Sequence, residues 1–188
     1  MHVPDETDCL ALLRKYKTPE HIVQHSQRVW EVARVITHGL SMRSIMLDMD
    51  LVRASSLLHD IAKYPCIVAG RGYHDVVGEE MLNGEGLPSV ALIVVQHVIL
   101  RNDDGQAVRE EHVVHYSDKR VVHDKVVDLE ERFDYLLKAY GKTARAQERL
   151  MEMKDETKRL EERIFRFLDF TPNDLLSIIE ATGSRSRG

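Results

Sequence analysis

The chain has 188 residues, of which 43% are apolar and 30% are charged, so it can bury the core of one domain with some additions. It contains no apolar run of the roughly 18 residues that a transmembrane helix needs, and it starts with no secretory signal pattern. The net charge of -5 argues against long nucleic acids and anionic membranes as partners. Two cysteines without a CxxC pair fit a cytoplasmic protein.

The first two predicted helices bring a histidine onto an apolar face. Residues 5–17 carry a mostly one-sided apolar pattern, which predicts a helix. A Thr-Pro pair then marks the start of a second helix, which we expect to end at Gly39. Within this helix His25 lies three residues after Ile22 and four before Val29, so its side chain is expected to face inward.

A third helix leads into an imidazole next to a carboxylate. We expect Asp50 to cap this helix, which runs into the sequence Leu-Leu-His-Asp-Ile-Ala-Lys. That sequence contains His59, Asp60 and Lys63. A proline two residues later prevents the helix from continuing, and residues 64–73 are predicted to form a loop.

Further helices are predicted over residues 74–82, 88–97, 110–118 and 129–140. Two of them end at residues able to bind a metal, His97 and Asp118, and the residues before each are mainly apolar. The chain carries no convincing strand pattern. The sequence therefore predicts an all-α protein.

The C-terminal part has a different pattern. From about residue 144 to residue 168, apolar residues recur at alternating spacings of four and three among mostly charged positions, as in a coiled-coil seam. One long helix lying across the core explains this pattern, and a helix that pairs with a second copy or a partner is the alternative. A short helix is expected up to residue 181. We therefore expect a domain over residues 1–141 and, over 142–188, a long helical extension that packs on it or mediates a homodimer.

Several candidate metal ligands lie at inward or helix-end positions of the predicted helices. They are His25, His59, Asp60, His97 and Asp118. A buried carboxylate is costly unless it is paired with or bound to a cation. Separate helices that each contribute imidazoles or carboxylates are how helical bundles build metal sites.

The order of His25, the pair His59-Asp60 and then Asp118 resembles the H…HD…D signature of the HD-domain metal-dependent phosphohydrolases. The Leu-Leu-His-Asp-Ile-Ala-Lys and Tyr-Ser-Asp-Lys contexts are typical of that family, as is the Asp-Leu-Glu-Glu-Arg-Phe stretch. The resemblance covers roughly residues 19 to 140. It implies an all-α HD-domain helical bundle in which these four side chains hold a divalent ion.

The resemblance also implies a reaction. A metal-activated water would cleave a phosphate ester or anhydride of a nucleotide or related small molecule, as a phosphatase, phosphodiesterase or pyrophosphatase does. Neutral imidazoles and carboxylates suit Mn²⁺, Fe²⁺, Co²⁺, Ni²⁺ or Zn²⁺, and Mg²⁺ is a further choice. Asp60 is expected to take part in catalysis, either by receiving the proton of the water or by bridging two ions.

His74 and His97 match places where some family members carry further histidines, which bind a second ion or contact the phosphate. Such two-metal members usually show two neighbouring histidines, whereas here Gln96 precedes His97. We therefore expect one ion, with two as the alternative. Lys63 matches a family lysine that holds phosphate, and it is expected to offset charge during catalysis.

Two more cations are candidates for binding the substrate phosphate. Arg28 lies three residues after His25, and Lys119 follows Asp118. The acidic chain could neutralise few phosphates at once, so a small molecule is the expected substrate. We expect no long nucleic acid and no membrane as a partner.

Two other functions remain open at the level of sequence. Helical sites with histidines and carboxylates can hold two irons and activate dioxygen, which would make the chain an oxygenase. The chain could instead be a non-catalytic module that senses a nucleotide and signals through the helix with the coiled-coil pattern.

Overall fold

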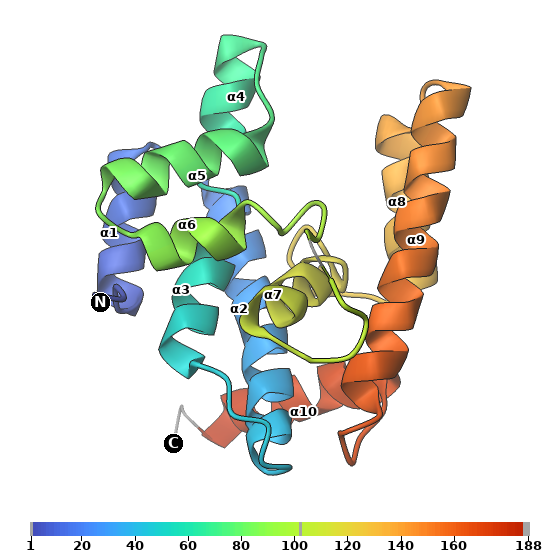
Figure 1. Cartoon of the computed structure of the whole chain (residues 1–188). Coiled ribbons are helices and arrows are strands. Elements are labelled where there is room, and N and C mark those ends of the chain that lie inside the picture. Colours follow the sequence, from blue (N-terminus) through green and yellow to red (C-terminus); the bar gives the residue numbers. More distant parts are fainter. Residues whose placement is uncertain (1, 102, 186–188) are drawn as a thin grey trace.

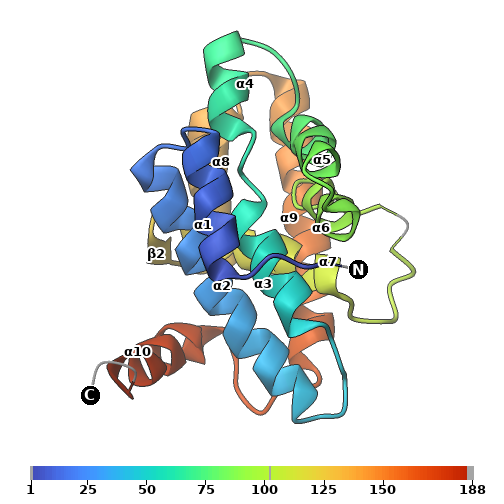
Figure 2. The same ribbon diagram turned by 90° about the vertical axis from the view of Figure 1, so that its left-hand side faces the viewer.

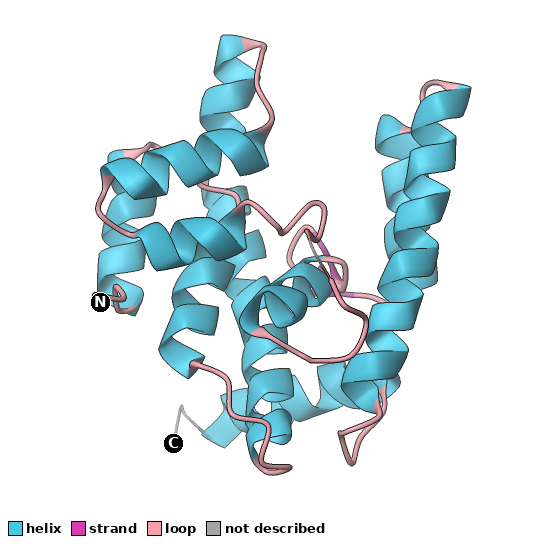
Figure 3. Ribbon diagram, viewed as in Figure 1, coloured by secondary structure: helices cyan, strands magenta, loops and turns pink. Residues whose placement is uncertain are grey.

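Helix α2 (Glu20–Ser41) runs through the centre of the molecule, as the computed structural model in Figure 1 shows. The structure describes residues 2–101 and 103–185. The other helices are α1 (Glu6–Lys15), α3 (Met49–Leu58), α4 (Lys63–Ala69), α5 (His74–Gly84), α6 (Pro88–Val94), α7 (Glu110–Asp118), α8 (Leu129–Tyr140), α9 (Ala144–Phe165) and α10 (Leu175–Arg185). A 3₁₀ turn, η1 (Pro172–Asp174), precedes α10. Helices dominate the described part of the chain (Figure 3), so the predicted all-α class is confirmed.

The apolar stripe of α2 explains its central position. Val29, Val32, Ala33 and Ile36 are fully buried and recur at the spacing of one helix face. This face packs against α3 and α7. His25 continues the same face toward the start of the helix and is 6% exposed, so it faces inward as predicted.

Two apolar clusters form the core on either side of α3. One cluster joins α2 and α7 to α8, α9 and α10, and the other joins α1 and α3 to α5 and α6. Figure 2 shows α1 and α3 in front of α2 when the molecule is viewed from the α1 side. The segment between α3 and α4 and the end of α7 therefore lie where the two halves of the core meet.

The ends of several helices differ from the predictions, and α6 ends at Val94 rather than at residue 97, so His97 lies in the turn after it. Helix α2 passes through Gly39 and ends at Ser41. The role of Gly39 is in packing, because its missing side chain lets Leu168 and Phe170 approach the helix. The cap of α3 is Asp48 rather than Asp50, since the Asp48 carboxylate accepts a hydrogen bond from the N–H of Leu51 at 3.0 Å.

The predicted loop over residues 64–73 is partly wrong. Residues Lys63–Ala69 form the short helix α4, with Pro65 in its first turn, where a missing N–H costs nothing. None of the α4 side chains is buried, so the helix carries no apolar stripe that the sequence could reveal. It ends at Gly70, whose φ of +64° favours glycine.

The prediction that the chain has no strands is wrong, because the structure contains a small hairpin. Strand β1 (Val121–Val122) pairs antiparallel with β2 (Lys125–Val126) through a two-residue turn. The turn residue His123 has a φ of +55°, a conformation typical of such tight turns. The strands have two residues each, too few for an alternating pattern to appear in the sequence.

Helix α9 packs against α8 and α7 (Figure 1), and the apolar residues of its C-terminal half are covered within the same chain. Thr157, Leu160 and Ile164 are buried, and the last two belong to the cluster that also contains the α2 stripe. These contacts fit the alternative in which the helix lies across the core. The division of the chain at residue 142 remains a prediction. None of the described helices is long and apolar enough to span a membrane.

Candidate metal centre

The His59-Asp60 pair lies directly after α3, in the turn that leads to α4. The turn places His59 at the C-cap of α3, and both side chains are almost completely buried. Three apolar residues around them, Leu57, Leu58 and Ile61, are fully buried, which fixes the turn between the two halves of the core.

His25 from α2 and Asp118 from α7 converge on this pair. The Nε2 atom of His25 lies 3.1 Å from Asp118 Oδ1 and 3.9 Å from Asp60 Oδ2. The Nε2 atom of His59 lies 3.5 Å from Asp60 Oδ2 and 3.7 Å from Asp118 Oδ1. The four residues, which are separated by up to 93 positions in the chain, therefore surround one point.

A second group of side chains shares the other oxygen of Asp60. His74, the first residue of α5, places its Nε2 atom 3.3 Å from Asp60 Oδ1, and His97 places its Nε2 atom 3.7 Å from the same oxygen. The two Nε2 atoms lie 3.1 Å apart. Asp60 therefore belongs to two sets of three side chains that could hold a metal ion, one with His25 and His59 and one with His74 and His97.

Backbone carbonyls fix the orientation of three of these imidazoles. The Nδ1 atoms of His25, His59 and His97 each lie within hydrogen-bond distance of a carbonyl oxygen. The acceptors are the carbonyls of His123, Ser56 and Val94, at 2.8, 2.8 and 2.7 Å. A carbonyl can only accept, so Nδ1 carries the proton in each ring and Nε2 presents a lone pair to the centre.

One of these Nε2 atoms, that of His59, is buried without a hydrogen-bond partner among the described residues. The Nε2 atom of His25 lies 3.1 Å from the negatively charged Oδ1 atom of Asp118. A cation between these atoms would satisfy all of them, so the donor set fits a divalent metal ion.

The charges around the centre keep its groups in the forms that a metal needs. Burial lowers the pKa of both His59 and His97 below the ordinary value, so both imidazoles are neutral. Burial alone would raise the pKa of the Asp60 carboxyl, but the surrounding positive charge, which includes the ammonium of Lys63, outweighs burial and holds that pKa well below its usual range. The same holds for the pKa of Asp118, where Lys119 and Arg132 outweigh burial.

Lys63 is the predicted phosphate-binding cation that lies at the centre. Its Nζ atom is 2.6 Å from Asp60 Oδ2, and a third of the side chain is exposed to solvent. Burial lowers the pKa of Lys63, but the charge and the hydrogen bond of Asp60 outweigh burial and raise it. Lys63 therefore stays charged at an accessible edge of the centre.

The other two predicted phosphate-binding cations are both hydrogen-bonded to groups of the protein. Lys119 is 3% exposed, and its Nζ atom donates to Asp118 Oδ2 and to the backbone carbonyl of His97, each at 2.8 Å. Arg28 donates to Glu31 Oε2 at 2.6 Å and to the backbone carbonyl of residue 124 at 2.8 Å. These contacts give Lys119 a positioning role and hold Arg28 on the hairpin. A role for either in binding phosphate stays a prediction.

The sequence analysis missed Arg132. This residue is 8% exposed, and its Nη2 atom lies 3.3 Å from Asp118 Oδ1, so its guanidinium helps to fix that carboxylate. The Asp-Leu-Glu-Glu-Arg-Phe stretch contained the signal. Asp128 of this stretch caps α8 at Glu131, which sets the turn of helix on which Arg132 lies.

Fold and site together define a class, the helical bundles with an inward-facing histidine and aspartate centre suited to divalent metals. The sequence pattern of the HD domain matches residues 22–171. The chain therefore belongs to the HD-domain family, as its resemblance implied.

Similar proteins include two archaeal enzymes named tRNA (cytidine(56)-2'-O)-methyltransferase. That of Thermoplasma volcanium is 32% identical over 146 residues, and that of Picrophilus torridus is 25% identical over 147 residues. The matches cover 70% and 71% of this chain but 41% of each enzyme, so the chain spans less than half of their length. Uncharacterized protein MJ0778 of Methanocaldococcus jannaschii is 26% identical over 158 residues, which cover 75% of this chain and 90% of that protein. No solved structure matches the chain.

Proposed function

We propose that this chain is a metal-dependent phosphohydrolase that holds two divalent ions and cleaves a phosphate ester or anhydride of a small molecule such as a nucleotide. His25, His59 and Asp118 would bind one ion, and His74 and His97 the other, with Asp60 between them. The sequence analysis expected one ion. The two oxygens of Asp60, each near a different pair of histidines, favour two.

One observation carries this proposal. Three imidazoles donate their Nδ1 protons to backbone carbonyls and turn their Nε2 lone pairs toward two buried carboxylates. Acceptors gathered in a buried place repel one another unless a cation lies among them. Ligands oriented by backbone hydrogen bonds of this kind are typical of metal centres.

Imidazole nitrogens and carboxylate oxygens suit Mn²⁺, Fe²⁺, Co²⁺, Ni²⁺ or Zn²⁺, and Mg²⁺ is a weaker fit because it prefers oxygen ligands. Bound ions of this kind supply Lewis-acid chemistry, since they lower the pKa of a water and polarise a phosphoryl oxygen. The partly exposed Lys63 would hold the substrate phosphate and offset the negative charge that develops on it. Lys119 and Arg132 would keep Asp118 ionised and in place.

The similarity to tRNA methyltransferases does not change this choice of reaction. Those enzymes are more than twice as long as the matched segment, and methyl transfer is named for the whole proteins. A centre rich in metal ligands fits phosphoryl chemistry. Because the chain has a net charge of -5, we propose a small phosphate compound rather than a long nucleic acid as substrate.

A di-iron oxygenase is the second candidate, favoured by the position of His74 and His97 next to Asp60. Iron analysis together with oxygen uptake separates the two functions. Two irons per chain with oxygen consumption, and no phosphate release under any condition, would favour the oxygenase.

The test is a phosphate-release screen over nucleotides and other small phosphate compounds with Mn²⁺, Mg²⁺, Co²⁺ and Ni²⁺ in turn. We expect turnover with at least one metal, loss of both turnover and bound metal in Asp60→Ala, and neither loss in the control Asp155→Ala on the exposed face of α9. Undiminished turnover in Asp60→Ala would contradict the proposal. Tight nucleotide binding without turnover under every metal would instead indicate a sensing module.

A further inference from the structure

A cavity of about 410 Å³ lies between α7, α9 and the segment that joins α6 to α7. Neither the six candidate metal ligands nor Lys63 lines this cavity. A hydrogen bond connects the cavity wall to the metal centre. The Nδ1 atom of His115 in the wall lies 3.2 Å from the backbone carbonyl oxygen of Gln96, the residue before His97. The volume of the cavity is in the range of pockets that hold small organic ligands.

The wall of the cavity offers hydrogen-bonding groups that the protein leaves unpaired. His115 is 4% exposed, and because its Nδ1 proton faces a carbonyl, its Nε2 atom is an acceptor with no partner among the described residues. Arg163 is 6% exposed and gives its two terminal nitrogens to the Asp103 carboxylate, each at 2.7 Å. Its Nε atom is buried without a hydrogen-bond partner in the described part of the chain.

The cavity also has apolar surface and free charges. Leu100 and Leu160 provide the apolar lining. Arg159 and Glu156 lie exposed on α9 beside it, and no ion pair or hydrogen bond engages either side chain within the described residues. A ligand that fits would have a flat apolar body, an N–H donor for His115, and an anionic group for Arg159.

We propose that this cavity is a second ligand site, separate from the metal centre, which binds a nucleoside 5′-monophosphate with an amino-bearing base. The base would lie against Leu100 and Leu160, with its amino group donating to His115. The phosphate would pair with Arg159, and Glu156 would accept from a ribose hydroxyl.

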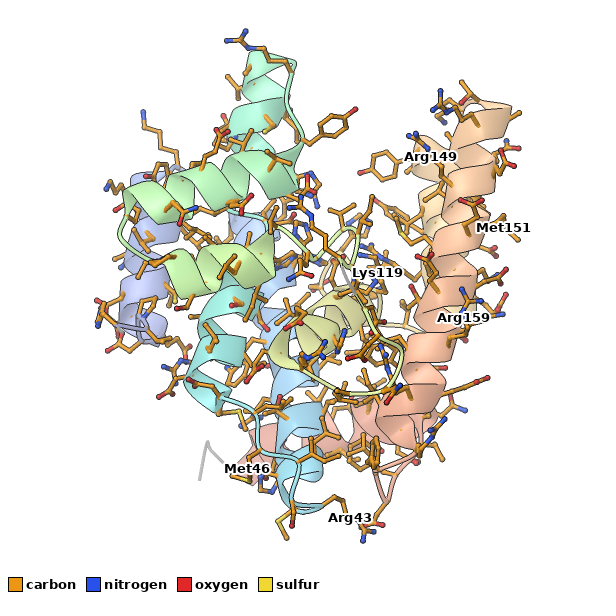
Figure 4. The ribbon with its side chains drawn as sticks, viewed as in Figure 1. Arg43, Met46, Lys119, Arg149, Met151 and Arg159 are labelled. Carbon is orange, nitrogen blue, oxygen red and sulfur yellow. The ribbon has the colours of Figure 1, made fainter. Side chains whose placement is uncertain are left out.

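Calorimetric titration of the full chain with adenosine monophosphate, in the presence of a chelator that removes divalent metals, tests this proposal. The chelator removes the ions that could hold a phosphate at the metal centre, so binding reports on the cavity. Arg159→Gln removes the free cation. Arg149→Gln makes the same change of charge nearer the tip of the α8–α9 hairpin (Figure 4) and serves as the matched control.

We expect the unmodified chain and Arg149→Gln to bind adenosine monophosphate equally, and Arg159→Gln to bind it at least about tenfold more weakly. Ribose 5-phosphate and inorganic phosphate should also bind at least about tenfold more weakly than the nucleotide. Absence of binding to the unmodified chain, or equal binding by Arg159→Gln, would overturn the proposal. Equal binding of ribose 5-phosphate would overturn the proposal that the cavity recognises a nucleotide, because the base would then contribute nothing to binding.

This binding experiment does not depend on the proposed hydrolysis. Where turnover is found, the Michaelis constant of Arg159→Gln provides a further check, and we expect it to equal that of the unmodified chain. A tenfold increase in this Michaelis constant with unchanged metal content would show that the cavity binds the substrate of the metal centre. That result would overturn the proposal of a separate site.

Discussion

At the scale of single residues, the metal centre depends on hydrogen bonds that the motif residues make with the backbone. The left-handed turn at His123 aims its carbonyl at His25, the last turn of α3 holds His59, and the end of α6 holds His97. Each bond selects one tautomer and one ring orientation, so the Nε2 lone pairs converge before any ion arrives.

Lys63 should contribute to turnover without contributing to metal binding. We expect Lys63→Met to lower kcat about 100-fold, because the ammonium of Lys63 stabilises the negative charge that develops on the phosphate in the transition state. Metal content should not change, since Lys63 contacts Asp60 but is no ligand. Steady-state kinetics and metal analysis check this prediction, with exposed Lys138→Met on α8 as the control. Equal kcat in both variants would count against the role of Lys63.

His115 should make stability depend on pH. Burial lowers its pKa to about 3, whereas an imidazole in the unfolded chain has a pKa of about 6.5. Between these values the unfolded state binds a proton that the folded state does not, so the free energy of unfolding decreases as the pH falls. We expect His115→Phe to lose less stability on acidification, by up to about 1.4 kcal/mol per pH unit, in urea unfolding over this range. Parallel pH profiles for the variant and the unmodified chain would show the prediction to be wrong.

The sequence identifies which side chains converge at the centre, but it does not identify the partners of the cations. The order of His25, His59-Asp60 and Asp118 can be read from the sequence, because histidine and aspartate are the residue types that bind such metal ions. The partners of Lys119 and Arg132 are set by packing between α7, α8 and the segment after α6. No local pattern contains that information.

At the scale of elements, α9 is part of the core. Ile164 is fully buried in the cluster that contains the α2 stripe, whereas Met151 on the same helix is 46% exposed. We expect Ile164→Ala to destabilise the whole domain by about 2–5 kcal/mol and Met151→Ala by less than about 0.5 kcal/mol. Denaturant unfolding followed by circular dichroism measures both. If Ile164→Ala melted only a small part of the helical signal in a separate transition, α9 would be an independent extension.

Element prediction succeeded where a helix has an apolar stripe and failed where it has none. The stripes of α2 and α8 are clear in the sequence, and the predicted span 129–140 equals α8. Helix α4 buries no side chain, and the two strands are too short to show alternation. Gly39 was taken as a helix end, although its role is to admit Leu168 and Phe170.

At the scale of the whole molecule, the chain itself covers the C-terminal half of the apolar seam of α9. Leu160 and Ile164, which would pair with a second copy in a coiled coil, are 3% and 0% exposed. We therefore expect a monomer of 21.6 kDa in sedimentation equilibrium. A concentration-independent mass of twice that value would support the homodimer instead.

The central claim is that side chains from α2, α5, α7 and the segments after α3 and α6 hold two ions that share Asp60. Metal content measured by mass spectrometry after loading with Mn²⁺ and removal of free metal tests it most directly. We predict two ions per chain in the unmodified protein and almost none in Asp60→Ala. A metal content that Asp60→Ala leaves unchanged would contradict the claim.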